Sequence, residues 1–112
     1  MATIRGDGQR WDYTPDGAAV TAGDVVLLGT DSEIISVVVA DTKDGELGAV
    51  QVAGLVDFDT SDTLVQGDAA YYNSVSDEMT DETTDTYAGR VEEMLTNIVR
   101  VDINFGQTPS GS

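Results

Sequence analysis

The sequence contains no histidine and no cysteine among its 112 residues. Without these residues the chain cannot build a Ser-His-Asp triad, a cysteine nucleophile, a disulfide or an ordinary zinc site. A nucleophile and its base would have to come from carboxylates, hydroxyls or the single lysine, Lys43. The composition therefore argues against an enzyme, and we expect no cofactor and no metal ion.

Positive charge is also scarce. Five Lys and Arg residues stand against 21 Asp and Glu residues, which gives a formal net charge of -16 at pH 7. A surface of this charge repels the phosphates of DNA and RNA. It also repels an anionic membrane surface. We therefore expect neither nucleic acid nor membrane among the partners.

Long apolar runs are missing as well. The longest uncharged run, Ile34 to Ala40, is interrupted by Ser36 and is far shorter than the ~20 residues that a membrane-spanning helix needs. The first residues, from Met1 to Asp7, lack the apolar centre of a signal peptide. We therefore expect the chain to be synthesised in a cytoplasm.

The residues that are present indicate strands and turns. Hydrophobic residues make up 40% of the chain, which is enough for the core of one small domain. Val, Ile and Thr are abundant, and turn residues recur every 8–12 residues or so, as in sandwiches and barrels. The predicted fold is all-β, a small β-sandwich or partly open β-barrel with at most one or two short helical turns.

Two segments alternate clearly between apolar and polar residues, which predicts strands with one buried face. In the segment Ile98 to Phe105, the predicted inward residues are Val99, Val101, Ile103 and Phe105, and the predicted outward residues are Arg100, Asp102 and Asn104. In the segment Leu47 to Phe58, the predicted inward residues are Val50, Val52, Val56 and Phe58, and the predicted outward residues are Gln51 and Asp57. Gly54 inside the second segment indicates a bulge or a bend.

Weaker patterns predict the remaining elements. Further strands are expected at Arg10–Thr14, Asp24–Leu28, Ile34–Ala40, Asp68–Asn73 and Tyr87–Glu93. A helix is the alternative for Tyr87–Glu93, because Val91, Met94 and Leu95 fall at helical spacing. The segment Thr60–Gly67 is typical of a single helical turn, capped by Ser61 or Asp62 and ended by Gly67.

The densest group of carboxylates lies between Ser76 and Asp85. Oxygen ligands of this kind suit Ca²⁺, but the segment lacks the central glycine and the ligand spacing of an EF-hand loop. We therefore interpret it as a loosely ordered, solvated acidic loop between two strands.

The chain divides into three parts: residues 1–14 as an N-terminal segment and possible interface arm, residues 15–105 as the β-domain, and residues 106–112 as a disordered tail. The N-terminal segment holds the candidate interface residues Ile4, Arg5, Arg10, Trp11 and Tyr13. Its two arginines are notable in so acidic a chain, and Trp and Tyr are frequent anchors of protein interfaces. The alternative is that Trp11 and Tyr13, on one face of a first strand, belong to the core.

Several segments, taken in order, resemble the small β-rich capsid cement or decoration proteins of phages. Gly17–Gly29 resembles the pattern G-x-x-V-x-x-G-D-x-V-x-x-G, Asp44–Phe58 resembles G-E-x-G-x-V-x-V-x-G-V-F, Val65–Asn73 resembles x-x-G-D-x-V-Y-W-D, and Tyr87–Val91 with Ile98–Ile103 resembles the closing strands. Together these segments cover residues 17–105. The chain carries more acidic residues than is typical of the family.

This resemblance implies a structural protein of the virion, synthesised in the host cytoplasm. Such a protein binds the outer surface of an icosahedral phage capsid and stabilises it. The implied partners are the major capsid protein and further copies of the same chain in a homotrimer. The alternative is another phage or cell-surface β-module, such as a head-fibre base or a carbohydrate-binding domain. An exposed aromatic platform that lines a groove would favour sugar binding, whereas a flat patch repeated around a three-fold axis would favour a cement protein.

Overall fold

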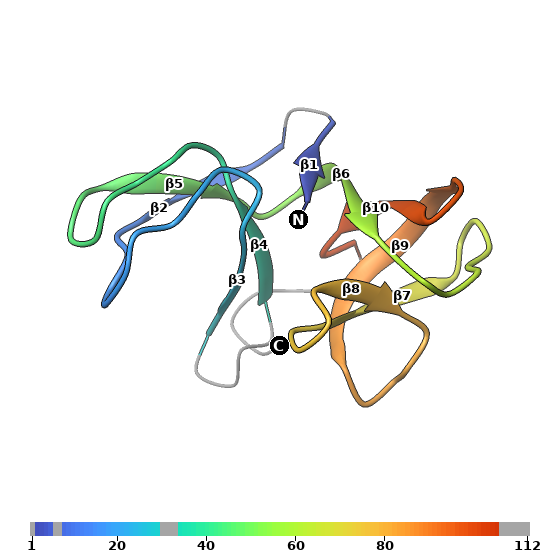
Figure 1. The fold of residues 1–112 in the computed structure, drawn as a ribbon. Coiled ribbons are helices and arrows are strands. Elements are labelled where there is room, and N and C mark those ends of the chain that lie inside the picture. Colours follow the sequence, from blue (N-terminus) through green and yellow to red (C-terminus); the bar gives the residue numbers. More distant parts are fainter. Residues whose placement is uncertain (1, 6–7, 30–33, 106–112) are drawn as a thin grey trace.

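The computed structural model describes residues 2–5, 8–29 and 34–105. These residues form ten strands in two antiparallel sheets and no helix (Figure 1). The sheets lie against each other in a sandwich-like arrangement, and neither closes into a barrel. The predicted all-β fold is confirmed. The predicted disordered tail, residues 106–112, lies outside the described residues.

The larger sheet has six strands. In spatial order they are β1 (Thr3–Ile4), β6 (Gly54–Asp59), β10 (Ile98–Ile103), β9 (Thr86–Met94), β7 (Ala69–Asn73) and β8 (Glu78–Thr80). The sheet curls back on itself, so that the end of β6 meets β8 through an isolated parallel bridge between Thr60 and Met79. The curl encloses most of the apolar side chains of the molecule.

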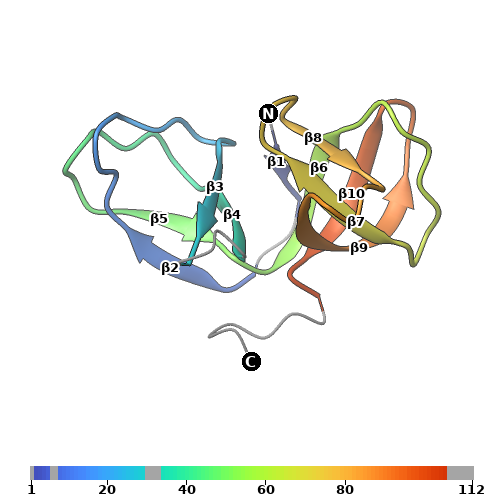
Figure 2. The same cartoon turned by 90° about the horizontal axis from the view of Figure 1, so that it is seen from below.

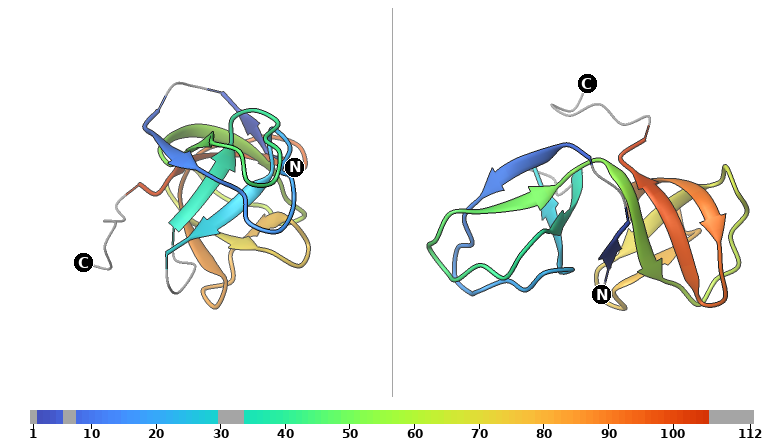
Figure 3. Two further views of the ribbon diagram at one scale, coloured as in Figure 1. Left: turned by 90° about the vertical axis from the view of Figure 1, so that its left-hand side faces the viewer. Right: turned by 90° about the horizontal axis from the view of Figure 1, so that it is seen from above.

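The smaller sheet has four strands. In spatial order they are β2 (Arg10–Tyr13), β5 (Gly48–Gln51), β4 (Ile34–Val38) and β3 (Val25–Leu28). Figure 2 shows it as a second lobe beside the larger sheet. Figure 3, right, shows the chain passing from β5 in one lobe directly into β6 in the other.

Strand β4 contributes to both apolar clusters of the molecule. Ile35 and Val37 pack into the main cluster with the six-stranded sheet, whereas Val38 belongs to a second cluster on the other face of its sheet. All five residues of β4 are buried, and the strand lies between β3 and β5. The strand predicted at Ile34–Ala40 is confirmed, although it ends at Val38 rather than at Ala40.

The segment Leu47–Phe58 does not form one strand, so that prediction is wrong. It forms β5 and β6, which belong to different sheets, and Gly54 (φ 99°) stands where β6 begins. Apolar and polar residues alternate with a period of two both when a strand continues in one sheet and when the chain crosses to another sheet, so the sequence does not distinguish the two cases. Gln51 and Asp57 are also not outward but buried. Gln51 pairs with Val37, and the six-stranded sheet covers that face of the smaller sheet.

The predicted helical turn at Thr60–Gly67 is wrong as well. The Thr60 side chain accepts a hydrogen bond from the Asp62 backbone (3.1 Å) and donates one to the Met79 carbonyl (2.8 Å). These bonds tie the segment to β8 and compete with a helical turn. The buried side chain of Leu64 fixes its middle, and the Gly67 N–H donates to the Val91 carbonyl.

The acidic segment Ser76–Asp85 is more ordered than predicted. Its middle forms β8, whose Met79 side chain is completely buried. Asp77 at the preceding turn has a left-handed backbone (φ 55°) and accepts a hydrogen bond from the Tyr72 hydroxyl at 2.6 Å. Met79 is the one apolar residue between Ser76 and Asp85. Its side chain fills the curl of the six-stranded sheet and so holds this acidic segment in place as a strand.

The other predicted strands are confirmed with small changes at their ends. Tyr87–Glu93 forms a strand and not a helix, within β9. Val99, Val101 and Ile103 on β10 are buried as predicted. Phe105 was predicted to face inward but is 56% exposed, because β10 ends at Ile103 and Asn104 turns the chain with φ 58°.

Candidate functional site

The N-terminal residues are built into both sheets. Thr3 and Ile4 pair with β6 of the larger sheet, whereas β2 pairs with β5 of the smaller one. Ile4 is half-buried against the main cluster and also lines a hollow of about 310 Å³ between β1 and the end of β4. The segment therefore links the two lobes.

Trp11 and Tyr13 share one face of β2, as the sequence predicts. Both are half-buried against the second cluster, whereas Arg10 and Asp12 on the other face are exposed. Arg10 makes no ion pair with any residue in the part of the chain that the structure describes. The side chains of Trp11 and Tyr13 are therefore partly in the core and partly accessible to a partner. A role in binding remains a prediction for all five candidate residues of the N-terminal segment.

Arg5 forms an ion pair within the chain. Its Nε donates to Asp57 Oδ2 at 2.8 Å, and Arg100 Nε donates to Asp57 Oδ1 at the same distance. Burial raises the pKa of Asp57, but the hydrogen bonds and positive charges of Arg100 and Arg5 outweigh it and hold the pKa below its usual range. Asp57 is 6% exposed, whereas Arg5 is 53% exposed and keeps contact with solvent.

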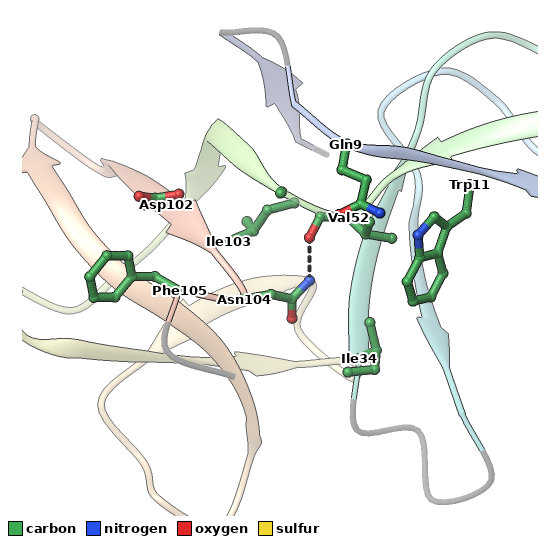
Figure 4. A pocket seen from close by; sticks show the side chains of 9 residues that line it. Gln9, Trp11, Ile34, Val52, Asp102, Ile103, Asn104 and Phe105 are labelled. Atoms are coloured by element: carbon green, nitrogen blue, oxygen red, sulfur yellow. Dashed lines mark hydrogen bonds between the residues drawn. The ribbon is translucent and has the colours of Figure 1, made fainter. Parts of the chain in front are cut away.

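A groove of about 210 Å³ lies where the two sheets meet (Figure 4). Its lining comes from β2, β4, the crossover after β5 and the end of β10. The lining residues are Gln9, Trp11, Ile34, Val52, Ala53, Asp102, Ile103, Asn104 and Phe105. Figure 4 shows Trp11 and Phe105 at opposite ends, with Val52 and Asn104 between them and the ring of Phe105 turned away from Trp11. The groove thus collects large apolar side chains from both lobes.

Asn104 joins the sheets beside the groove. Its Nδ2 donates to the Ile35 carbonyl at 2.8 Å and to the Val52 carbonyl at 2.7 Å. Its Oδ1 is buried and accepts no hydrogen bond from the residues that the structure describes. Because both amide hydrogens are used, this side chain holds the end of β10 against β4 and the crossover. It was predicted to face outward, and that prediction is wrong.

Phe105 is held in place although its ring is largely exposed. Its carbonyl accepts a hydrogen bond from the Tyr87 hydroxyl at 2.5 Å. The Tyr87 ring in turn makes an edge-to-face contact with Tyr71, with ring centres 5.8 Å apart. The backbone that presents Phe105 at the groove is therefore fixed by neighbouring strands.

The sequence interpretation found Trp11 but missed the rest of the groove. Phe105 carried a usable signal: it follows Asn104, a residue type that tolerates a left-handed backbone and can end a strand. Ile34 and Val52 lie near Trp11 only because segments distant in sequence pair or pack together, and no local sequence pattern predicts that arrangement.

Among the residues that the structure describes, no three His, Cys, Asp or Glu side chains lie close enough together to hold a metal ion. The same residues include no helix long and apolar enough to cross a membrane.

An all-β body that presents a fixed aromatic groove has the features of a protein that acts by binding a partner. The comparison with protein families makes this specific: the model of the phage cement protein family matches residues 6–99, which include strands of both sheets. The chain belongs to the phage cement protein family. Neither a curated protein nor a solved structure matches it. Its role is structural, in association with the phage capsid.

Proposed function

We propose that the protein binds the outer surface of an icosahedral phage head and stabilises it. The family match over residues 6–99 carries this proposal. The charge supports the outer surface as the location, because a protein with a net charge of -16 is repelled by packaged DNA. The task is mechanical: many copies of one modest interface together resist the internal pressure of the head.

The proposed assembly is a homotrimer that bridges neighbouring capsid subunits and contacts the major capsid protein. In this proposal the N-terminal segment, residues 1–14, contributes to the interface through Ile4, Arg5, Arg10, Trp11 and Tyr13. The exposed guanidinium groups of Arg5 and Arg10 support it, since arginine forms bidentate pairs with carboxylates of a partner.

Purified heads that lack the protein test this proposal. Recombinant protein should sediment with the heads, reach saturation, and raise the temperature at which the heads release their DNA. Ultracentrifugation of the free protein, and a count of copies per head, test the trimer separately. Heads that neither bind the protein nor gain heat resistance would rule out the cement function.

The groove supports a second candidate function, carbohydrate binding, because aromatic residues line it. A head-fibre base or a sugar-binding module would use Trp11 as a stacking platform. Binding to host-cell polysaccharide in the absence of binding to heads would favour this alternative.

A further inference from the structure

The size of the groove limits what can enter it. At about 210 Å³ it lies below the range of roughly 300–1,000 Å³ that is usual for small-molecule sites. It has room for about seven water molecules at their liquid volume. One large side chain of a partner would displace this water from Trp11, Ile34 and Val52.

The lining favours an apolar side chain over a sugar. Sugars need donors and acceptors around an open aromatic face. Here both amide hydrogens of Asn104 are already bonded to backbone carbonyls, and its Oδ1 is buried. Ile34 and Val52 supply aliphatic walls. The groove therefore offers apolar walls, with Asp102 and the exposed Gln9 as further polar side chains in its lining.

The charge around the groove favours a basic partner. Asp102 lines it. This aspartate is in no ion pair within the part of the chain that the structure describes. Arg90 stands opposite Asp102 in the pairing of β9 with β10, but its Nη1 donates to the Gly67 carbonyl at 3.3 Å, and Arg100 pairs with Asp57.

The groove is also prepared for binding. Asn104 joins its two sides, and Tyr87 fixes the backbone of Phe105. A partner therefore does not have to order these groups, which is a cost that usually reduces affinity. Phe105 thus presents an exposed ring from a fixed backbone, and large aromatic side chains are frequent interface anchors.

We infer that this groove receives one large apolar side chain of the major capsid protein, from a segment that also carries a lysine or arginine for Asp102. This inference rests on the proposed function. It identifies Ile34 and Val52, beside Trp11, as the residues that contact the inserted side chain, and Phe105 as an exposed ring at the rim that contacts the same capsid segment.

The first test removes the exposed ring of Phe105 at the rim of the groove. Phe105→Ser should weaken binding to purified heads about tenfold or more, as expected for the loss of an interface anchor. Leu47→Ser is the matched control, because Leu47 is 72% exposed. It lies just before Gly48, the residue of β5 that pairs with Tyr13, and so at the opposite end of β5 from Val52. Circular dichroism checks that both variants are folded.

The second test changes the charge at the rim without touching the core. Gln9 is exposed and lines the groove. Gln9→Arg should weaken binding to heads, and Gln9→Glu should strengthen it, each by a factor of about two to five at low ionic strength. Both effects should shrink in added salt. Equal binding by the two variants would contradict a basic capsid segment.

The third test uses Trp11 as a reporter, since it is the only tryptophan of the chain. Short tryptophan-free peptides that cover the capsid protein should include a basic, apolar peptide that shifts its fluorescence. Chitotriose and maltotriose should not. A saturable response to either sugar would overturn the inference.

The outcomes separate the two proposals. If wild type binds heads and Phe105→Ser binds equally well, the groove is not the contact, although the cement function stands. If wild type does not bind heads at all, the proposed function and the inference both fail.

Discussion

The two sheets of this protein are unequal in what they bury. The six-stranded sheet encloses the main cluster, which includes completely buried Met79 and Val101. The second cluster has three buried residues, Val38, Val50 and Val52, and is completed by half-buried side chains such as Trp11. The larger sheet therefore supplies most of the stability, whereas the smaller sheet depends on it and presents the groove.

This difference shows how a small chain combines stability with a binding surface. The six-stranded sheet uses its apolar residues for its own core. The smaller sheet leaves some of its apolar surface incompletely covered, at the groove beside Asn104 and Phe105. If this division is correct, substitutions in the larger sheet should affect folding, and substitutions at the groove should affect binding.

The largest effect is expected for Met79→Ala. Met79 fills the curl of the six-stranded sheet and is completely buried, so truncation should lower the free energy of unfolding by about 2–5 kcal/mol. Urea denaturation measures it. Val75→Ala is the control and should have little effect, because Val75 lies in the turn between β7 and β8 and is exposed. A loss below about 1 kcal/mol for Met79→Ala would contradict this view of the core.

A smaller loss in the free energy of unfolding is expected for Asn104→Asp. This variant tests whether the Asn104 side chain joins the two sheets. A carboxylate cannot donate to the Ile35 and Val52 carbonyls, so the variant should lose about 2–3 kcal/mol. Asn97→Asp is the matched control, because Asn97 also has a left-handed backbone (φ 60°) but is exposed. Hydrogen exchange should accelerate more in β2–β5 than in β6–β10. Uniform acceleration would show that Asn104 does not join two separable sheets.

The ion pairs of Asp57 should contribute about 1–2 kcal/mol, measured as the stability difference between wild type and Asp57→Asn. Because the pKa of Asp57 is lowered in the folded state, this contribution is fully present above the usual carboxyl pKa. It should disappear as the pH falls through the lowered pKa. Arg100→Gln should cost more than Arg5→Gln, since Arg100 is less exposed (26% against 53%). A difference that does not change with pH would mean that these charges do not stabilise the fold.

The smallest effect is expected from salt. Self-repulsion among 16 net negative charges should decrease as sodium chloride is added, and the melting temperature should rise by a few degrees. Calcium chloride at equal ionic strength is the control and should do no more. A large rise with micromolar calcium alone would indicate a specific cation site.

Local patterns predicted the strands well and the site only in part. Alternation located β10 and the apolar run located β4, because burial of one face or two faces leaves a direct mark on the sequence. The division of Leu47–Phe58 between two sheets left no such mark. Asn104 bonds Ile35 and Val52, which are 69 and 52 residues away in sequence, and such contacts depend on sheet packing. Trp11 could be selected by residue type, whereas Ile34 and Val52 became part of the groove only through the fold.

A cryo-electron microscopy map of the decorated head tests the central claim most directly, namely that the junction of the two sheets is the capsid-binding surface. We predict that the groove faces the capsid, with density for one capsid side chain against Trp11, Ile34 and Val52 and a basic residue next to Asp102. A map in which the groove is open to solvent, and the capsid contacts the β7–β8 side of the larger sheet, would contradict it.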